Sequence, residues 1–196
     1  STTVQRIAEA NYAQEVVMVD ILEGKPQGLA LDMNQAQSIE GFQTNIIGTN
    51  SYEETADSDI CVITAGMPRK PGMSRMDLLE VNAGIVSDVT KKLSGVSPNA
   101  VLIVVSNPLD EMTALASAVS GFDKSKVMGQ AGMLDTARFK YFVAQKCGVP
   151  TNKIEAMTLG SHGDTMVPVP SLVKVDGKAL TDVLSNEEIV EKIRNA

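Results

Sequence analysis

The stretch VLIVVSNPLD, residues 101–110, decides the fold class of this chain. Its first five residues are all apolar, and such a run without alternation is typical of a strand covered on both faces, as in a parallel sheet. Pro108 suits the first turn of a following helix. Apolar side chains then recur at helical spacing from Leu109 to Val119, so the stretch predicts a buried strand, a short turn and a helix.

The same alternation continues on both sides of this stretch. Further apolar runs stand at residues 16–19, 60–64 and 127–129, and apolar helical faces at residues 78–93 and 131–147. Strands that alternate with helices indicate βαβ units. We therefore expect an α/β fold with a doubly wound, Rossmann-type parallel sheet.

The pattern changes after Pro150. The apolar stretches at residues 154–159, 167–169 and 172–175 are short and are interrupted by prolines. Short runs of this kind favour small antiparallel strands. We expect a second domain to begin near residue 130.

Composition narrows the classes of partner. The chain has 17 basic and 24 acidic residues among 196, a net charge of −7, and phosphate binding requires clustered positive charge, so nucleic acid is not expected. The longest apolar run, residues 100–105, is far shorter than the roughly 20 residues of a membrane span. The first residues match no targeting signal, so a cytoplasmic location is expected. Cys61 and Cys147 lie in apolar surroundings and are interpreted as reduced core thiols.

Ligands of such a sheet bind beyond the carboxyl ends of its strands. Asp20 follows the run at 16–19 and is either a partner for the ribose hydroxyls of a dinucleotide or a turn residue. Thr64, Ala65 and Gly66 follow the run at 60–63 and are small enough for backbone to approach a ligand closely. Asn107 either holds a substrate oxygen or a ribose, or caps the helix that follows.

The segment MPRKPGMSR, residues 67–75, combines two prolines, a glycine and three cations. It is either a mobile lid that carries anion-binding groups or a solvated surface loop.

His162 is the single histidine of the chain and stands in GSHGD, residues 160–164. The flanking glycines indicate a turn. Asp135 and Arg138 are three positions apart and share a face of the predicted helix. A carboxylate bonded to one imidazole nitrogen would fix the tautomer and leave the other nitrogen to move a proton, while Arg138 would offer a two-pronged donor for a carboxylate.

Other chemistries find little support. One histidine and two distant cysteines make no metal-ligand cluster. No G-x-S-x-G elbow is present for a serine hydrolase. Tyr141 is followed four positions later by Gln145, where short-chain dehydrogenase chemistry needs a lysine.

Five motifs, in this order, resemble those of the lactate-dehydrogenase-like malate dehydrogenases. They are VVMVD at 16–20, ITAGMPRKPGMSR at 63–75, VVSNPLD at 104–110, GMLDTARF at 132–139 and GSHGDTMVP at 160–168. The resemblance implies a dinucleotide-binding domain over residues 1–129 and the N-terminal part of an α+β substrate domain over residues 130–196.

The resemblance also implies a role for each site residue. His162 would be the proton donor and acceptor, Asp135 its carboxylate partner, and Arg138 the clamp on the C1 carboxylate of the substrate. Arg75 would polarise the reacting carbonyl. Asn107 and Arg69 would bind the substrate, with Arg69 at the position where malate enzymes carry arginine and lactate enzymes glutamine. The implied cofactor-binding residues are Asp20, Thr64, Ala65, Gly66, Val105 and Asn107.

The implied activity is reversible, NAD-dependent hydride transfer between (S)-malate and oxaloacetate, in the tricarboxylic acid cycle, by a homodimer or homotetramer. Pyruvate would leave Arg69 buried without a partner, so the dicarboxylate is favoured. Asp20 would accept from both ribose hydroxyls and repel a 2′-phosphate, which favours NAD over NADP.

The sequence departs from the family pattern at both ends. No G-x-G occurs in the chain, and STTVQRIAEA, residues 1–10, is typical of the helix that follows a glycine-rich phosphate loop. We therefore expect a chain that lacks its first strand, this loop and its C-terminal part. The alternatives are a related 2-hydroxy acid dehydrogenase of the lactate type, and an inactive fragment that serves as a binding module.

Overall fold

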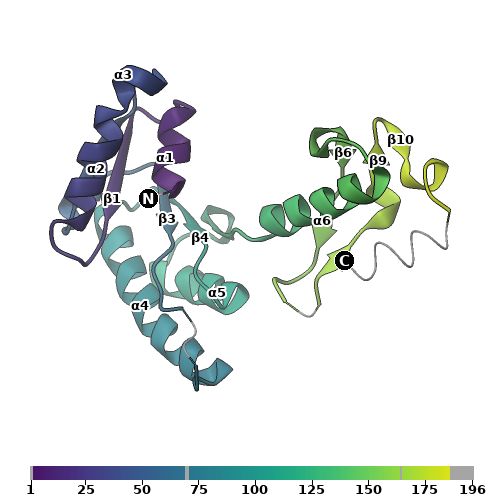
Figure 1. The fold of residues 1–196 in the computed structure, drawn as a ribbon. Coiled ribbons are helices and arrows are strands. Elements are labelled where there is room, and N and C mark those ends of the chain that lie inside the picture. Colours follow the sequence, from purple (N-terminus) through teal and green to yellow (C-terminus); the bar gives the residue numbers. More distant parts are fainter. Residues whose placement is uncertain (1, 69–70, 164, 186–196) are drawn as a thin grey trace. The chain divides into compact units, whose positions relative to one another are not determined.

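The structure is a computed structural model that describes residues 2–68, 71–163 and 165–185, with Arg75 described by its backbone alone (Figure 1). The chain divides into two compact units. Unit 1 comprises residues 1–61 and 88–101, and unit 2 comprises residues 62–87 and 102–196. Within the described ranges, no helix is both long and apolar enough to cross a membrane.

Unit 1 is built on a pair of parallel strands. Its elements are α1 (Thr2–Glu9), β1 (Glu15–Val19), α2 (Lys25–Gln35), α3 (Gln37–Glu40), β2 (Asn45–Thr49) and the 3-10 turn η1 (Glu53–Thr55). β1 and β2 pair from Glu15 opposite Asn45 to Val19 opposite Thr49. The core between the helices and this pair consists of Ala8, Met18, Ala30, Phe42 and Ile46.

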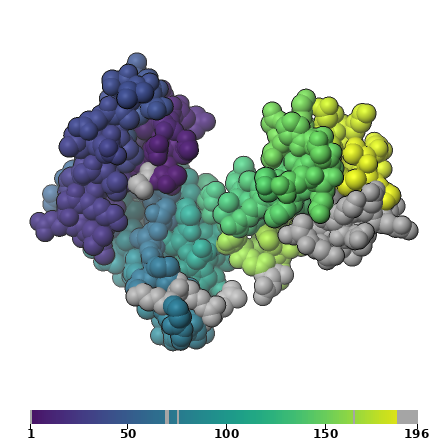
Figure 2. Space-filling model, viewed as in Figure 1, coloured from purple at the N-terminus to yellow at the C-terminus, as the bar shows by residue number. Residues whose placement is uncertain are grey.

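Helix α2 packs very closely on β2. A methyl group at Gly48 would lie 2.0 Å from the carbonyl oxygen of Pro26, in the first turn of α2. Glycine is therefore required here by a close approach of two backbones. The opposite side of α2 and α3, violet-blue in Figure 2, is open to solvent, and Leu31 and Ile39 are exposed.

The second sheet has the strand order β3-β4-β5. Its strands are β3 (Ile60–Ile63), β4 (Val101–Val104) and β5 (Val127–Gly129), accompanied by α4 (Arg75–Val96), α5 (Leu109–Ser120) and η2 (Lys124–Lys126). β4 and β5 are parallel, with Leu102 opposite Val127. Val86 of α4 packs with Val104, Met112 and Ala116 in the core of this region. The predicted α/β, Rossmann-type parallel fold is confirmed.

The expectation that every strand is covered on both faces is wrong for β3. Cys61 and Ile63 are buried, but Ile60 and Val62 are 58% and 37% exposed. Successive side chains of a strand point to opposite faces, and only one face of β3 is covered by the residues that the structure describes. Neither cysteine forms a disulfide; Cys61 is buried, and burial raises the pKa of its thiol.

The remainder of unit 2 begins with α6 (Gly132–Cys147), which ends at Gly148 with φ of +66°. Short elements follow: η3 (Thr151–Lys153), β6 (Ile154–Glu155), β7 (Thr158–Leu159), β8 (Val167–Pro168), η4 (Pro170–Leu172), β9 (Lys174–Val175), β10 (Lys178–Ala179) and η5 (Leu180–Asp182). Pairing is antiparallel in both small sheets, β10-β9-β6 and β7-β8. The prediction of small antiparallel strands after Pro150 is confirmed.

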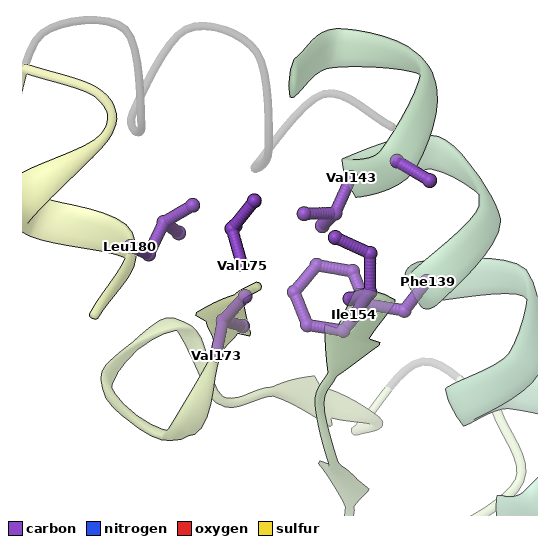
Figure 3. Packing of buried hydrophobic residues seen from close by; sticks show 7 residues of the cluster. Phe139, Val143, Ile154, Val173, Val175 and Leu180 are labelled. Carbon is purple, nitrogen blue, oxygen red and sulfur yellow. The ribbon is translucent and has the colours of Figure 1, made fainter. Parts of the chain in front are cut away.

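These short strands are stabilised by packing on α6. Phe139 and Val143 of the helix meet Ile154, Val173 and Val175 from the strands and the loop that precedes β9 (Figure 3). Fully burying such side chains contributes about 1.5–3 kcal/mol each. The start of α6 is also bonded to β7, because the Thr136 hydroxyl accepts from the Thr158 N–H at 3.1 Å.

Candidate active site

A carboxylate and an imidazole form the centre of the candidate site. Asp135 lies in the first turn of α6, and its side chain is 4% exposed. Its Oδ2 atom lies 2.8 Å from Nδ1 of His162. Because a carboxylate accepts hydrogen bonds, it favours the tautomer in which Nδ1 carries the proton. The other ring nitrogen, Nε2, is left to accept or release a proton.

The turn between β7 and β8 carries His162. Gly160 has φ of +92°, and a methyl group there would lie 2.5 Å from the carbonyl oxygen of Thr165. The hydroxyl oxygens of Ser161 and Thr165 are 2.5 Å apart. The glycine thus permits the close approach to Thr165 within the turn that carries His162.

Arg138 lies one helical turn after Asp135, as the spacing predicts. One guanidinium nitrogen is 3.4 Å from Oδ1 of Asp135, so the two carboxylate oxygens face Arg138 and His162 separately. The Arg138 side chain is 61% exposed, which leaves most of its five donors open to a ligand.

A cavity of about 570 Å³ adjoins the pair, within unit 2. Asp135 and His162 both line it, together with Asp110 and Thr113 of α5 and Gly129 at the end of β5. The imidazole and a second carboxylate, Asp110, therefore both line a space large enough for a small molecule.

The ends of β3 and β4 are fastened together. The Val105 N–H donates to the Ile63 carbonyl at 2.8 Å, and the Ser106 hydroxyl donates to the Ala65 carbonyl at 2.6 Å. Thr64 and Gly66 are exposed beyond β3. These small residues lie at the carboxyl end of the strand, where the sequence analysis expects backbone to approach a ligand.

Asn82, buried within α4, connects two of these segments. Its Oδ1 atom accepts from the Met67 N–H at 2.8 Å, and its Nδ2 atom donates to the Asn107 carbonyl at 2.7 Å. A methyl group at Gly66 would lie 3.3 Å from the same amide. Asn82 therefore holds the root of the basic segment and the residue before Pro108 in fixed positions, while the Asn107 side chain is exposed.

Asp20 belongs to unit 1 and lies directly after β1. Its Oδ1 atom accepts from the Leu22 N–H at 2.9 Å, and its Oδ2 atom lies 3.8 Å from Lys25 Nζ. The Asn50 amide donates to the carbonyls of Asp20 and Leu22 at 2.7 and 3.0 Å. Asp20 thus shapes the turn after β1 through Oδ1, while Oδ2 makes the longer contact with Lys25.

Two predicted substrate-binding residues are not placed. Arg69 and the side chain of Arg75 lie outside the described residues. The structure does describe where α4 begins: Ser74 N–H donates to Asp77 Oδ2, and Asp77 N–H donates to Ser74 Oγ, at 2.9 and 3.0 Å. This reciprocal cap lowers the pKa of Asp77, chiefly through the Ser74 backbone N–H.

No group of three or more His, Cys, Asp or Glu side chains suited to a metal ion is found among the described residues. The His162–Asp135 pair, with the exposed Arg138 guanidinium beside it, is an arrangement suited to proton transfer beside a cavity.

Sequence reasoning overlooked the residues that hold the site in place. Asn82 falls on the apolar face of its helix, and a polar residue on such a face is a signal that could have found it. Ser106 and Asp110 entered the sequence analysis only as members of the motif VVSNPLD at 104–110, without a role of their own. The hydroxyl of Thr136, which accepts from the Thr158 N–H at 3.1 Å, left no signal.

Comparison with protein families gives two matches that together cover most of the chain. Residues 1–129 match the lactate/malate dehydrogenase NAD binding domain, and residues 132–195 match the lactate/malate dehydrogenase alpha/beta C-terminal domain.

Similar proteins carry the same family names. The malate dehydrogenase of Roseiflexus sp. (strain RS-1) is 54% identical over 175 residues, and that of Chloroherpeton thalassium 50% over 196 residues. These alignments cover 89% and 100% of the chain but 57% and 63% of the relatives, so the chain spans about six tenths of their length.

Solved structures agree on the fold. Malate dehydrogenase from Salinibacter ruber superposes with a TM-score of 0.91 at 44% identity, covering 99% of this chain and 61% of that one. Lactate dehydrogenase from Cryptosporidium parvum, complexed with lactic acid and nicotinamide adenine dinucleotide, superposes with a TM-score of 0.89 at 38% identity. That match covers 98% of this chain and 62% of that one. The chain belongs to the lactate/malate dehydrogenase family.

Proposed function

We propose that the protein is an NAD-dependent malate dehydrogenase, which interconverts (S)-malate and oxaloacetate. The observation that carries this proposal is the 2.8 Å contact between His162 Nδ1 and the buried Asp135. A histidine oriented by a carboxylate is suited to take the hydroxyl proton of a 2-hydroxy acid and to return it to a 2-oxo acid. The names of the relatives support the same reaction.

His162 works through its two nitrogens in turn. With Nδ1 donating to Asp135, Nε2 accepts the hydroxyl proton of malate, and the imidazolium that forms is stabilised by the adjacent carboxylate. When bound, NAD would accept the hydride that leaves C2 of malate. In the reverse direction His162 returns its proton to the carbonyl oxygen of oxaloacetate.

Substrate recognition is assigned to arginine and amide donors. The exposed guanidinium of Arg138 is free to form a two-pronged pair with the C1 carboxylate. Arg69 is proposed to bind the second carboxylate, Arg75 to polarise the carbonyl, and Asn107 to bond a substrate oxygen. A monocarboxylate such as pyruvate would leave Arg69 without an anion, which disfavours the lactate-type alternative.

Each unit, taken by itself, offers groups suited to part of a dinucleotide. Thr64, Ala65 and Gly66 leave backbone open beyond β3, and Val105 and Asn107 follow the neighbouring strand. Oδ2 of Asp20 has room to accept from ribose hydroxyls. No glycine-rich phosphate motif occurs in the 196 residues, so the fit concerns the ribose and nicotinamide portions.

We also propose a dinucleotide-binding domain over residues 1–129 and a substrate domain that starts at residue 130. The two family matches support this division. A homodimer or homotetramer in the cytoplasm, acting in the tricarboxylic acid cycle, is the setting that the resemblance favours. Cysteines without a disulfide suit a reducing compartment, and a net charge of −7 disfavours nucleic acid.

The test is oxidation of NADH, followed by absorbance, on purified protein of recorded intact mass. Oxaloacetate is the substrate and pyruvate the control, with wild type, His162→Asn and Arg69→Gln compared. We expect turnover with oxaloacetate, loss of at least about 100-fold in His162→Asn, and a shift toward pyruvate in Arg69→Gln. Equal activity of His162→Asn and wild type would refute the assigned chemistry, and a wild type that prefers pyruvate would refute the substrate.

A further inference from the structure

The backbone of His162 is bonded to a second carboxylate, on a different helix from Asp135. The His162 N–H donates to Oδ2 of Asp110 at 3.1 Å. The two residues are 52 positions apart in the chain, so this contact joins α5 to the turn between β7 and β8. The reaction proposed above assigns no role to Asp110.

Asp110 is presented by a firmly packed helix. It is the second residue of α5, where the helix dipole favours a negative charge. Its neighbours Leu109 and Met112 are 7% and 1% exposed, and the Met112 N–H donates to the Pro108 carbonyl at 3.0 Å. The first turn of α5 is thus a fixed support for the Asp110 carboxylate.

The turn that donates this bond is connected to the rest of unit 2 by two short strands. β7 and β8 are two residues each, and they pair Thr158 with Pro168 and Leu159 with Val167. The strand pairing and the Ser161–Thr165 contact set the internal shape of the turn. They do not connect the turn to α5, which the bond to Asp110 does. A hydrogen bond from a backbone amide to a carboxylate is stronger than one between neutral groups, which suits it to this task.

We propose that Asp110 is a positioning residue that fixes the main chain at His162, so that the imidazole stays aligned with Asp135 and with the cavity that all three line. Asp135 orients the ring, and Asp110 locates the turn that carries it. A displacement of about 1 Å is enough to impair a proton transfer, so this contact is expected to influence turnover without touching the substrate.

The test uses the single histidine of the chain. Protein labelled with ¹⁵N-histidine gives one backbone amide signal, whose hydrogen exchange is measured without substrate or cofactor. The variants are Asp110→Ala, which removes the acceptor, and Asp110→Asn, which keeps an acceptor oxygen without the charge. Glu111→Ala is the matched control, because Glu111 is also exposed in the first turn of α5.

Relative to wild type, we expect the His162 amide to exchange roughly tenfold faster or more in Asp110→Ala, less so in Asp110→Asn, and within about twofold in Glu111→Ala. Unchanged exchange in a folded Asp110→Ala would overturn the proposal. If Asp110→Ala does not fold, Asp110→Asn decides: faster exchange than in Glu111→Ala supports the role, and equal exchange refutes it.

A second readout rests on the proposed function. In the oxaloacetate assay, Asp110→Ala is expected to lower kcat about tenfold with little change in KM, and Asp110→Asn to recover part of the loss. A folded Asp110→Ala with wild-type kcat refutes the catalytic consequence. Inactive wild-type protein would refute the proposed function, whereas the exchange experiment would still decide the role of Asp110 at the turn.

Discussion

The Nδ2 atom of Asn82 donates to the carbonyl oxygen of Asn107 at 2.7 Å, so a buried helical side chain fixes the segment that leads into α5. The same amide accepts from the Met67 N–H. The segments that follow β3 and β4 are therefore both bonded to the side chain of Asn82, which is 2% exposed.

Replacing Asn82 with alanine leaves the Met67 N–H and the Asn107 carbonyl, in two part-buried hydrogen bonds, without this partner. We expect the free energy of unfolding to fall by about 1–3 kcal/mol. Urea denaturation measures the change, and Glu80→Ala, exposed on the same helix, controls for helix propensity. Equal losses in the two variants would contradict the assigned bonds.

Asp135→Asn preserves the size of the side chain but removes the charge that stabilises an imidazolium. We expect kcat for oxaloacetate reduction to fall by roughly 100-fold or more, with the fold retained. The NADH assay and circular dichroism together measure this. Asp123→Asn, at the exposed cap of η2, should leave turnover unchanged, and comparable activity in both variants would argue against the Asp135–His162 pair.

Two glycine substitutions in unit 1 should have opposite effects. Gly48→Ala forces a methyl group against the Pro26 carbonyl, and overpacking of this kind typically costs about 1–3 kcal/mol. Gly28→Ala, inside α2 with open space around it, should stabilise by about 0.5–1 kcal/mol. Thermal unfolding of both variants tests the pair; a neutral Gly48→Ala would show that α2 does not approach β2 so closely.

Stability should depend on pH through the reciprocal cap at the start of α4. The pKa of Asp77 is lowered in the folded chain, so its ionised form contributes stability above the ordinary aspartate pKa of about 3.9. That contribution is lost as the pH falls through the lowered folded value. Urea midpoints of wild type and Asp77→Ala should therefore differ at pH 6 and converge toward pH 3, and a difference independent of pH would contradict this.

Much of the fold follows from local patterns. β1 and β4 are runs of apolar, β-branched residues, and α6 ends at the glycine that the sequence marks as its stop. β2 and α2 were not predicted. In β2 only Ile46 and Ile47 are strongly apolar. Gly48 weakens the strand pattern, and the need for glycine there comes from the close approach of α2, which the sequence does not reveal.

The candidate site shows the same division. The shared face of Asp135 and Arg138 follows from their spacing. The positions of Asn82 and Asp110 depend on contacts across 25 and 52 residues, which no local pattern encodes. Tertiary packing decides which polar side chains meet, so supporting residues are harder to infer than reacting ones.

The loop after β1 is held in place by side-chain hydrogen bonds of its own. Asn50 binds the carbonyls of both Asp20 and Leu22, and Gln27 donates in turn to Asn50 at 2.7 Å. Such preorganisation means that little conformational entropy remains to be lost when a hydroxyl group meets the Asp20 carboxylate. Less of the binding free energy is then spent on ordering the loop, and more of it can contribute to discrimination between ligands.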